Sequence, residues 1–95
     1  MATFSVIRII DGDTFEVTPN WKWQAQTGSR VRPAGYNAPE LPLPGSSTAS
    51  EQLSRLILGK TVELGAASKI EIDRGHLVCE VYFNGRNLAD YFSRY

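Results

Sequence analysis

Two carboxylates separated by a single glycine lie near the start of the chain, in Asp11-Gly12-Asp13-Thr14. Runs of apolar and β-branched residues precede and follow them. An Asp-Gly pair between two such runs predicts a tight hairpin turn, in which Gly12 supplies a positive φ angle. The aspartates then have two interpretations. Either both only form the turn, through hydrogen bonds to the backbone, or one of them contributes to a chemical site.

A second polar group follows a strand-like run further along the chain. Arg32, Asn37 and Glu40 lie in Arg-Pro-Ala-Gly-Tyr-Asn-Ala-Pro-Glu. An arginine in the middle of a strand is usually solvated, so Arg32 alone indicates no function. Its spacing to an amide and a carboxylate makes it a candidate site residue.

Taken together, Asp-Gly-Asp-Thr and Arg-x4-Asn-Ala-Pro-Glu resemble the signature of the staphylococcal nuclease (thermonuclease) family. The similarity continues in order through three later segments, so it covers most of the chain. These segments are Gly59-Lys60-Thr61-Val62-Glu63-Leu64, Asp73-Arg74-Gly75-His76 and Val81-Tyr82-Phe83-Asn84-Gly85-Arg86.

The resemblance implies one Ca²⁺ site where three strand ends meet. Asp13 and Asn37 match metal ligands of that family, and Ala38 matches a residue that offers its backbone carbonyl. Glu40 matches the carboxylate near the metal that positions or deprotonates the attacking water. Arg32 matches an arginine that binds the scissile phosphate. Hard oxygen ligands suit Ca²⁺, and Arg suits phosphate, so the residue types agree with these roles.

Two positions depart from the family pattern. Asn37 stands where a second aspartate is usual, so the site loses one charge and should bind Ca²⁺ more weakly. His76 stands where the family has its second catalytic arginine, and the loop before it is one residue short. Arg74 and His76 are therefore rival candidates for the second cation that binds substrate phosphate. The alternative for His76 is a half-exposed residue at the start of a strand.

The resemblance implies a Ca²⁺-dependent nuclease that hydrolyses phosphodiester bonds of DNA, RNA or both to 3′-phosphate products. The alternative is a catalytically impaired module that binds single-stranded nucleic acid or a protein partner. A third interpretation is a domain that positions a larger protein. Loss of cleavage in a Glu40→Gln variant would favour the first.

The elements that must position these residues form one domain over residues 1–95. The pattern predicts a mainly β fold with helices (α+β), a five-stranded OB-fold barrel with a helix between strands three and four and a short C-terminal helix. Thr48 and Glu51 match a capping box at the start of the first helix, and Gly59 ends it. The expected strands are 3–10, 14–18, 30–36, 60–64 and 77–83, with a bulge or turn at 65–68 before 69–72. The expected helices are 49–58 and 87–95.

Two tryptophans lie in the less regular segment 19–29. One interpretation extends the second strand through Trp21 and Trp23, with both rings on one face and a hairpin loop at 24–28. Exposed rings there would stack on nucleic-acid bases. The favoured alternative is that they cover the hydrophobic side of the hairpin.

The charge balance restricts the binding surface. The chain has ten basic and ten acidic residues, whereas nucleic-acid binders usually carry a basic excess. Any basic surface must therefore be local, built by Arg30, Arg32, Arg74 and Arg86. We expect weak, salt-sensitive affinity.

The remaining sequence features are ordinary for a globular protein. Cys79 is the single cysteine and is expected to be a buried structural thiol. No apolar run is long enough to cross a bilayer, and no signal peptide is visible. We expect a cytoplasmic or trimmed secreted protein without a membrane partner, monomeric by default.

Overall fold

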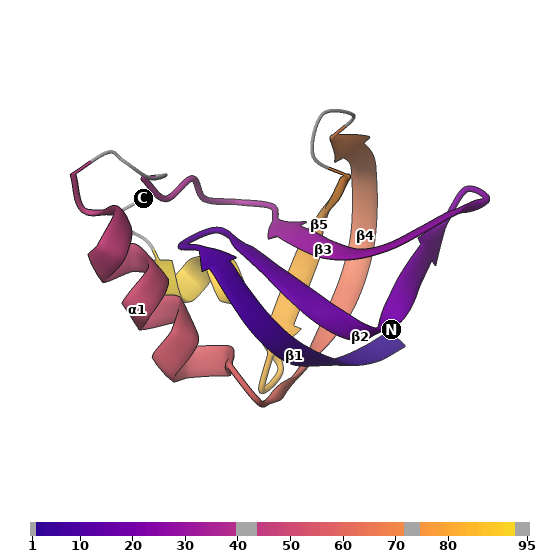
Figure 1. Cartoon of the computed structure of the whole chain (residues 1–95). Helices are drawn as coiled ribbons and strands as arrows, with labels where there is room; N and C mark the ends of the chain where they lie inside the picture. The colour runs from indigo at the N-terminus through magenta and orange to yellow at the C-terminus, as the bar shows by residue number, and fades with distance from the viewer. Residues whose placement is uncertain (1, 40–43, 72–74, 93–95) are drawn as a thin grey trace.

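The chain forms a β-barrel with one α-helix (Figure 1). The computed structural model describes residues 2–39, 44–71 and 75–92. Within those residues, no helix is both long and apolar enough to cross a membrane. The elements are β1 (Ala2–Asp11), β2 (Thr14–Trp23), β3 (Gln26–Pro33), α1 (Ser46–Ile57), β4 (Thr61–Glu71), β5 (His76–Phe83), β6 (Arg86–Asn87) and a 3₁₀ helix, η1 (Leu88–Phe92).

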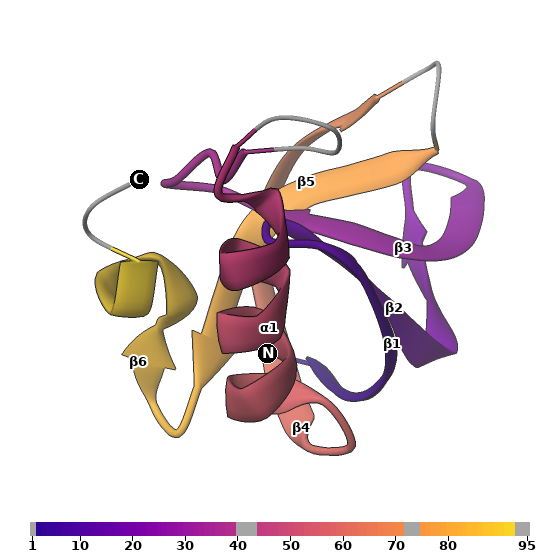
Figure 2. The ribbon, with the colours of Figure 1, turned by 60° about the vertical axis from the view of Figure 1, so that its left-hand side comes forward.

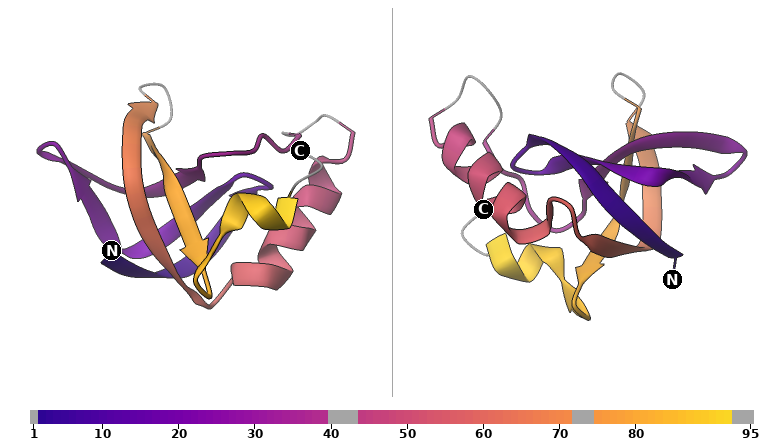
Figure 3. Two further views of the ribbon diagram at one scale, coloured as in Figure 1. Left: turned by 180° about the vertical axis from the view of Figure 1, so that it is seen from behind. Right: turned by 60° about the horizontal axis from the view of Figure 1, so that its bottom comes forward.

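The sheet closes on itself through one parallel pairing. The strands follow the order β3-β2-β1-β4-β5-β6, with antiparallel neighbours throughout. β3 also pairs with β5 in parallel, from Val31 with Leu77 to Pro33 with Cys79. Seen from behind and from below, β3 and β5 lie side by side (Figure 3). The result is a five-stranded mixed barrel, compatible with an OB-fold, and the predicted fold class is confirmed.

Alternate residues of the strands fill the barrel, and α1 covers one side of this core. Phe15, Val31 and Val81 are fully buried, as a period of two requires for a closed sheet. Leu53 and Ile57 are buried from the helix side, where α1 lies beside η1 (Figure 2). Each such side chain contributes about 1.5–3 kcal/mol by leaving water. This packing fixes α1 against the end of β1.

The helix begins earlier than predicted and lacks the expected capping box. It starts at Ser46 after Gly45, whose φ of 85° is left-handed, and no described side chain caps it. Thr48 is therefore already within the first turn and cannot act as the N-cap with Glu51. The predicted end is confirmed: Gly59 has a φ of 77°, and its N–H donates to the Val6 carbonyl at 3.0 Å.

The hairpin between β2 and β3 is longer and tighter than predicted. Its turn is only Gln24-Ala25, both at positive φ, so the expected loop at 24–28 is wrong. Trp21 is 3% exposed, and its Nε1–H donates to the Arg30 carbonyl at 2.8 Å. A Cβ on Gly28 would lie 2.7 Å from the Trp21 ring. Trp21 therefore covers the hairpin and is not an exposed stacking platform, and Trp23 is half-buried against the core.

The predicted break in the fourth strand is a set of bulges within one continuous strand. Ala67 pairs with Cys79 and Lys69 pairs with Val78, so Ser68 is an extra residue on β4. The Ser68 hydroxyl donates to the Val78 carbonyl at 3.3 Å. Such a bulge changes which side chain faces outward beyond it.

The C-terminal element is a 3₁₀ helix where an α-helix over 87–95 was expected. Its start follows the prediction, because Asn87 Oδ1 accepts a hydrogen bond from the Ala89 N–H at 2.9 Å. Leu88 and Phe92 are buried against the barrel. Residues 93–95 of the predicted helix lie outside the described residues.

Candidate functional site

The turn between β1 and β2 is where predicted, but Gly12 has a different purpose. Its φ angle lies outside the left-handed region. A Cβ there would lie 2.5 Å from the Ala49 Cβ and 2.8 Å from the Ala38 Cβ. The prediction of a positive φ is therefore wrong. Glycine is needed because α1 and the segment after β3 approach the turn too closely for any side chain.

Asp13 is a fully buried carboxylate, with 0% of the residue exposed. Its Oδ2 accepts a hydrogen bond from the Ala38 N–H at 3.2 Å and one from Arg32 Nη2 at 3.3 Å. The Thr14 hydroxyl lies 3.4 Å from its Oδ1. A buried charge is tolerated only when it is paired and hydrogen-bonded, and these donors meet that condition.

Arg32 joins the two halves of the candidate site. The same Nη2 that lies near Asp13 donates to Asn37 Oδ1 at 2.9 Å. The side chain is 22% exposed, so Arg32 is only partly buried. The structure thus brings together four predicted site residues, namely Asp13, Arg32, Asn37 and Ala38.

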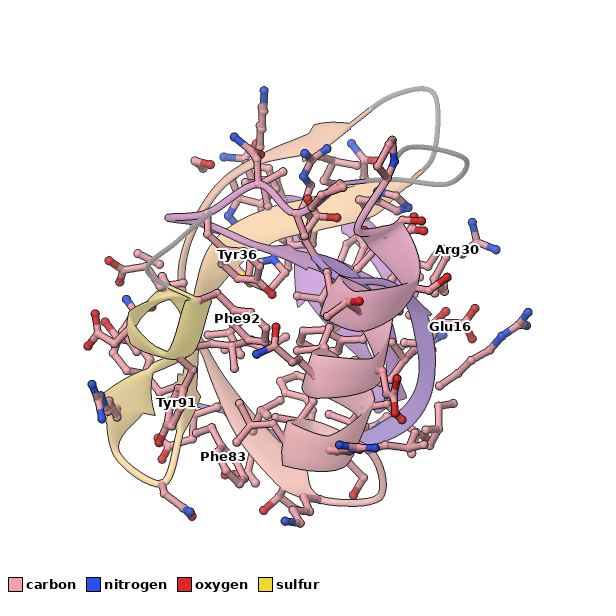
Figure 4. All side chains as sticks on the ribbon, turned by 90° about the vertical axis from the view of Figure 1, so that its left-hand side faces the viewer. Glu16, Arg30, Tyr36, Phe83, Tyr91 and Phe92 are labelled. Atoms are coloured by element: carbon pink, nitrogen blue, oxygen red, sulfur yellow. The ribbon has the colours of Figure 1, made fainter. Side chains whose placement is uncertain are left out.

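Tyr36 holds the turn that carries Asp13 and was not predicted as a site residue. Its hydroxyl donates to the Gly12 carbonyl at 2.9 Å. The ring stacks on Phe92, with 4.7 Å between centroids (Figure 4). Burial, and to a lesser extent the charge of Asp13, raises the pKa of Tyr36 well above its ordinary value, so the hydroxyl keeps its proton. In sequence, its only signal is an aromatic residue directly before Asn37.

The donor set suits a hard cation but provides little charge. Asp13 and Asn37 offer one carboxylate and one amide, both oxygen ligands of the kind Ca²⁺ takes. Within the described residues, no three acidic, histidine or cysteine side chains gather around a common point. Ala38 was expected to offer its carbonyl, and its N–H is the group that contacts Asp13. A Ca²⁺ ion here would depend on further ligands.

Of the remaining predicted site residues, the structure describes only His76. Glu40 and Arg74 lie outside the described residues. His76 is the first residue of β5, paired with Glu71 in the ladder, and it is only 2% exposed. The interpretation of His76 as a half-exposed residue is therefore wrong. Its role in binding phosphate stays a prediction.

Two arginines of the expected local basic surface, Arg30 and Arg86, have acidic partners. Arg30 Nε lies 3.5 Å from Glu16 Oε1, and these two side chains lie together in Figure 4. Arg86 Nε lies 3.7 Å from Asp90 Oδ2, and its guanidinium group also lies over a tyrosine ring. Each of these acidic partners reduces the contribution of its arginine to the expected basic surface.

A groove lies directly beside the candidate site. It has a volume of about 510 Å³, and its lining combines aliphatic and polar side chains of β3, the segment after it, β4 and β5. The described lining residues are Arg32, Pro33, Ala34, Gly35, Tyr36, Asn37, Lys69 and Val78. The groove therefore begins at the arginine that contacts Asp13.

Cys79 is a structural thiol, as expected. It is fully buried between the strands, and burial raises its pKa to about 12, with a smaller contribution from Glu80. A thiol held in this form is a poor nucleophile.

Comparison with known proteins adds no family assignment. No family model matches the chain, and no curated protein matches it either. The chain is therefore described by its fold and its candidate site alone. It is a small mixed β-barrel, compatible with an OB-fold, in which the buried carboxylate of Asp13 lies next to Arg32.

Proposed function

We propose that this chain is a Ca²⁺-dependent phosphodiesterase of the staphylococcal nuclease type, acting on single-stranded DNA, RNA or both. The observation that carries the proposal is the contact of Arg32 with both Asp13 and Asn37. Residues from two separate segments, which the sequence motifs assign to one site, lie within hydrogen-bond distance of each other.

Each residue has a role that follows from its chemistry. Arg32 binds two oxygens of the scissile phosphate through its planar fork of N–H donors. Asp13 and Asn37 would supply oxygen ligands to a bound Ca²⁺ ion, and Ala38 orients Asp13 through its N–H. A bound Ca²⁺ would polarise the phosphoryl oxygens and stabilise the charge that develops on them. Glu40 accepts a proton from the attacking water.

The reaction is a hydrolysis in which one P–O bond forms and another breaks. The water oxygen attacks phosphorus as its proton passes to Glu40. The bond to the 5′ oxygen breaks, that oxygen takes up a proton from water, and Glu40 releases its proton to the solvent. The products carry a 3′-phosphate and a 5′-hydroxyl. Positioning and electrostatic stabilisation supply most of the rate acceleration in such reactions.

One observation favours the second candidate, a binding module without catalysis. Arg32 already neutralises Asp13, the only carboxylate among the described residues of the cluster. A site with so little remaining negative charge would bind Ca²⁺ weakly. In that case the barrel would bind single strands without cleaving them.

An assay for cleavage of labelled single-stranded DNA and RNA, with Ca²⁺ or with EDTA, distinguishes the nuclease from the binding module. Glu40→Gln should lower the rate about 10²–10⁴-fold, the usual contribution of a general base. Glu51→Gln is the matched control, because Glu51 lies on the exposed face of α1 and pairs only with Arg55 among the described residues. Cleavage at the wild-type rate in Glu40→Gln would refute the catalytic assignment. No cleavage by the folded wild type in any condition would favour the binding module.

A further inference from the structure

The 3₁₀ helix η1 packs against the segment that leads from β3 to Asn37. The ring of Phe92 stacks on Tyr36, with 4.7 Å between centroids and 9° between the ring planes. One turn earlier in η1, Ala89 lies so close to Gly35 that a Cβ on Gly35 would be 2.8 Å from the Ala89 Cβ. η1 therefore contacts the two consecutive residues that directly precede Asn37.

Contacts outside the candidate site hold η1 in place. Leu88 is fully buried, and Asn87 of β6 accepts a hydrogen bond from the Ala89 N–H. The Tyr91 ring lies 6.3 Å from the ring of Phe83 on β5, apart from the stack that Phe92 forms (Figure 4). The position of Phe92 is therefore fixed from β5 and β6.

A series of contacts leads from Phe92 to the carboxylate of Asp13. Phe92 stacks on Tyr36, and the Tyr36 hydroxyl donates to the Gly12 carbonyl at 2.9 Å. Gly12 directly precedes Asp13, whose Oδ2 accepts a hydrogen bond from the Ala38 N–H at 3.2 Å. Ala38 lies two residues after Tyr36 in the chain. A shift of the Tyr36 ring would thus act on both partners of the Asp13–Ala38 hydrogen bond.

We propose that Phe92 is a positioning residue, which fixes the Asp13 carboxylate through Tyr36 and couples the candidate site to the docking of η1. The barrel closes through the pairing of β3 with β5, in which η1 takes no part. Undocking of η1 therefore loosens the site within a barrel that stays folded. The inference applies equally to a nuclease and to a binding module, because it concerns the geometry of Asp13.

Hydrogen exchange of single backbone amides, measured by NMR on the full chain, tests this coupling. The Ala38 N–H reports its bond to Asp13, and the Gly59 N–H, bonded to the Val6 carbonyl, reports the barrel elsewhere. Phe92→Leu keeps an apolar side chain and removes the stacked ring. It should raise the exchange rate of Ala38 about 2–10-fold more than that of Gly59, as expected for one aromatic contact.

Two further variants separate positioning from a general loss of packing. Tyr91→Leu is the matched control, because Tyr91 is the neighbouring aromatic residue of η1 and its ring faces Phe83. It should leave the exchange of Ala38 relative to Gly59 unchanged. Tyr36→Phe keeps the stack and removes the hydroxyl, so Phe92→Leu should have a smaller effect on Ala38 in that background.

The coupling is overturned if Phe92→Leu changes both amides equally, or if Tyr91→Leu has the same selective effect on Ala38. Additive effects of Phe92→Leu and Tyr36→Phe would likewise refute the path through the hydroxyl. If Phe92→Leu does not fold, Ala89→Val decides, since its larger side chain crowds Gly35 and should selectively raise Ala38 exchange. None of these measurements uses cleavage, so the proposed function can fail while the coupling stands.

Discussion

Arg32 Nη2 lies 3.3 Å from Oδ2 of Asp13, a carboxylate that is fully buried. The arginine thus provides the positive charge that a metal ion would otherwise supply. A cation and the guanidinium group compete for the same oxygens of Asp13 and Asn37, because both of these oxygens contact Nη2. This competition makes the effect of Ca²⁺ on stability dependent on Arg32.

Arg32→Gln should destabilise the fold in EDTA and increase its response to Ca²⁺. Breaking a buried ion pair costs about 3–5 kcal/mol, and the lower end applies because Arg32 is 22% exposed. Excess Ca²⁺ should then raise Tm more in the variant than in the wild type. Thermal unfolding with and without Ca²⁺ measures both effects, with Arg55→Gln on the exposed helix face as control. Equal Ca²⁺ shifts in all three proteins would contradict the competition.

Tyr36→Phe should lower stability and loosen the turn that carries Asp13. The substitution leaves the Gly12 carbonyl without its donor, at a cost of about 1–3 kcal/mol, while the stacked ring on Phe92 is kept. Denaturant unfolding gives the change in free energy. Tyr82→Phe is a suitable control, since its hydroxyl donates to Glu80 at 3.1 Å on the partly exposed outer face. A smaller loss for Tyr36→Phe than for Tyr82→Phe would show that the hydroxyl does not hold the turn.

Gly12→Ala should crowd the contact between the turn and α1. The new methyl group would lie 2.5 Å from the Ala49 Cβ, and overpacking of this kind costs about 1–3 kcal/mol or more. Adding Ala49→Gly removes the nearest atom, so the double variant should lose less stability than the sum of the two single variants. Additive losses from denaturant unfolding would argue against a direct clash.

Stability should fall as the pH rises above about 9, because Cys79 holds its proton more tightly when folded. Its pKa is raised from 9.0 to about 12, so the unfolded chain releases the proton first. The contribution of Cys79 to the free energy of unfolding is fully present below pH 9. It is lost between pH 9 and about pH 12, at no more than about 1.4 kcal/mol per pH unit. Cys79→Ala should show a shallower decline between pH 9 and pH 10, measured by denaturant unfolding. Identical slopes for the two proteins would exclude the thiol as the cause.

Much of the fold follows from local sequence patterns. Alternating apolar residues and turn pairs such as Asn84-Gly85 predicted the five strands, the helix after the third and the two-residue turn at Gly12. The wrong predictions concern positions where the residue types alone do not determine the local structure. Glycine is needed at position 12 because α1 and the segment after β3 approach closely, which the Asp-Gly pair does not report. The length of the β2–β3 hairpin depends on Gln24 and Ala25 adopting positive φ angles that their residue types do not favour.

Four of the residues that the sequence motifs indicated lie close together, whereas their surroundings were not predicted. The motifs indicated Asp13, Arg32, Asn37 and Ala38, and the structure brings all four together. Tyr36 and Lys69 carried no comparable signal. The first acts through a hydrogen bond to another segment, and the second faces the groove only because Ser68 is an extra residue in the ladder.

The parallel seam between β3 and β5 also has a consequence for folding. It pairs Val31 with Leu77, which are separated in the sequence by α1 and β4, so it closes a long loop. Pairings between strands so distant in sequence form slowly, because loop entropy is lost before the contacts stabilise them. Arg32 and Val78 become neighbours only in this step. A chain that has formed its hairpins and its helix but has not yet closed this seam therefore has no groove.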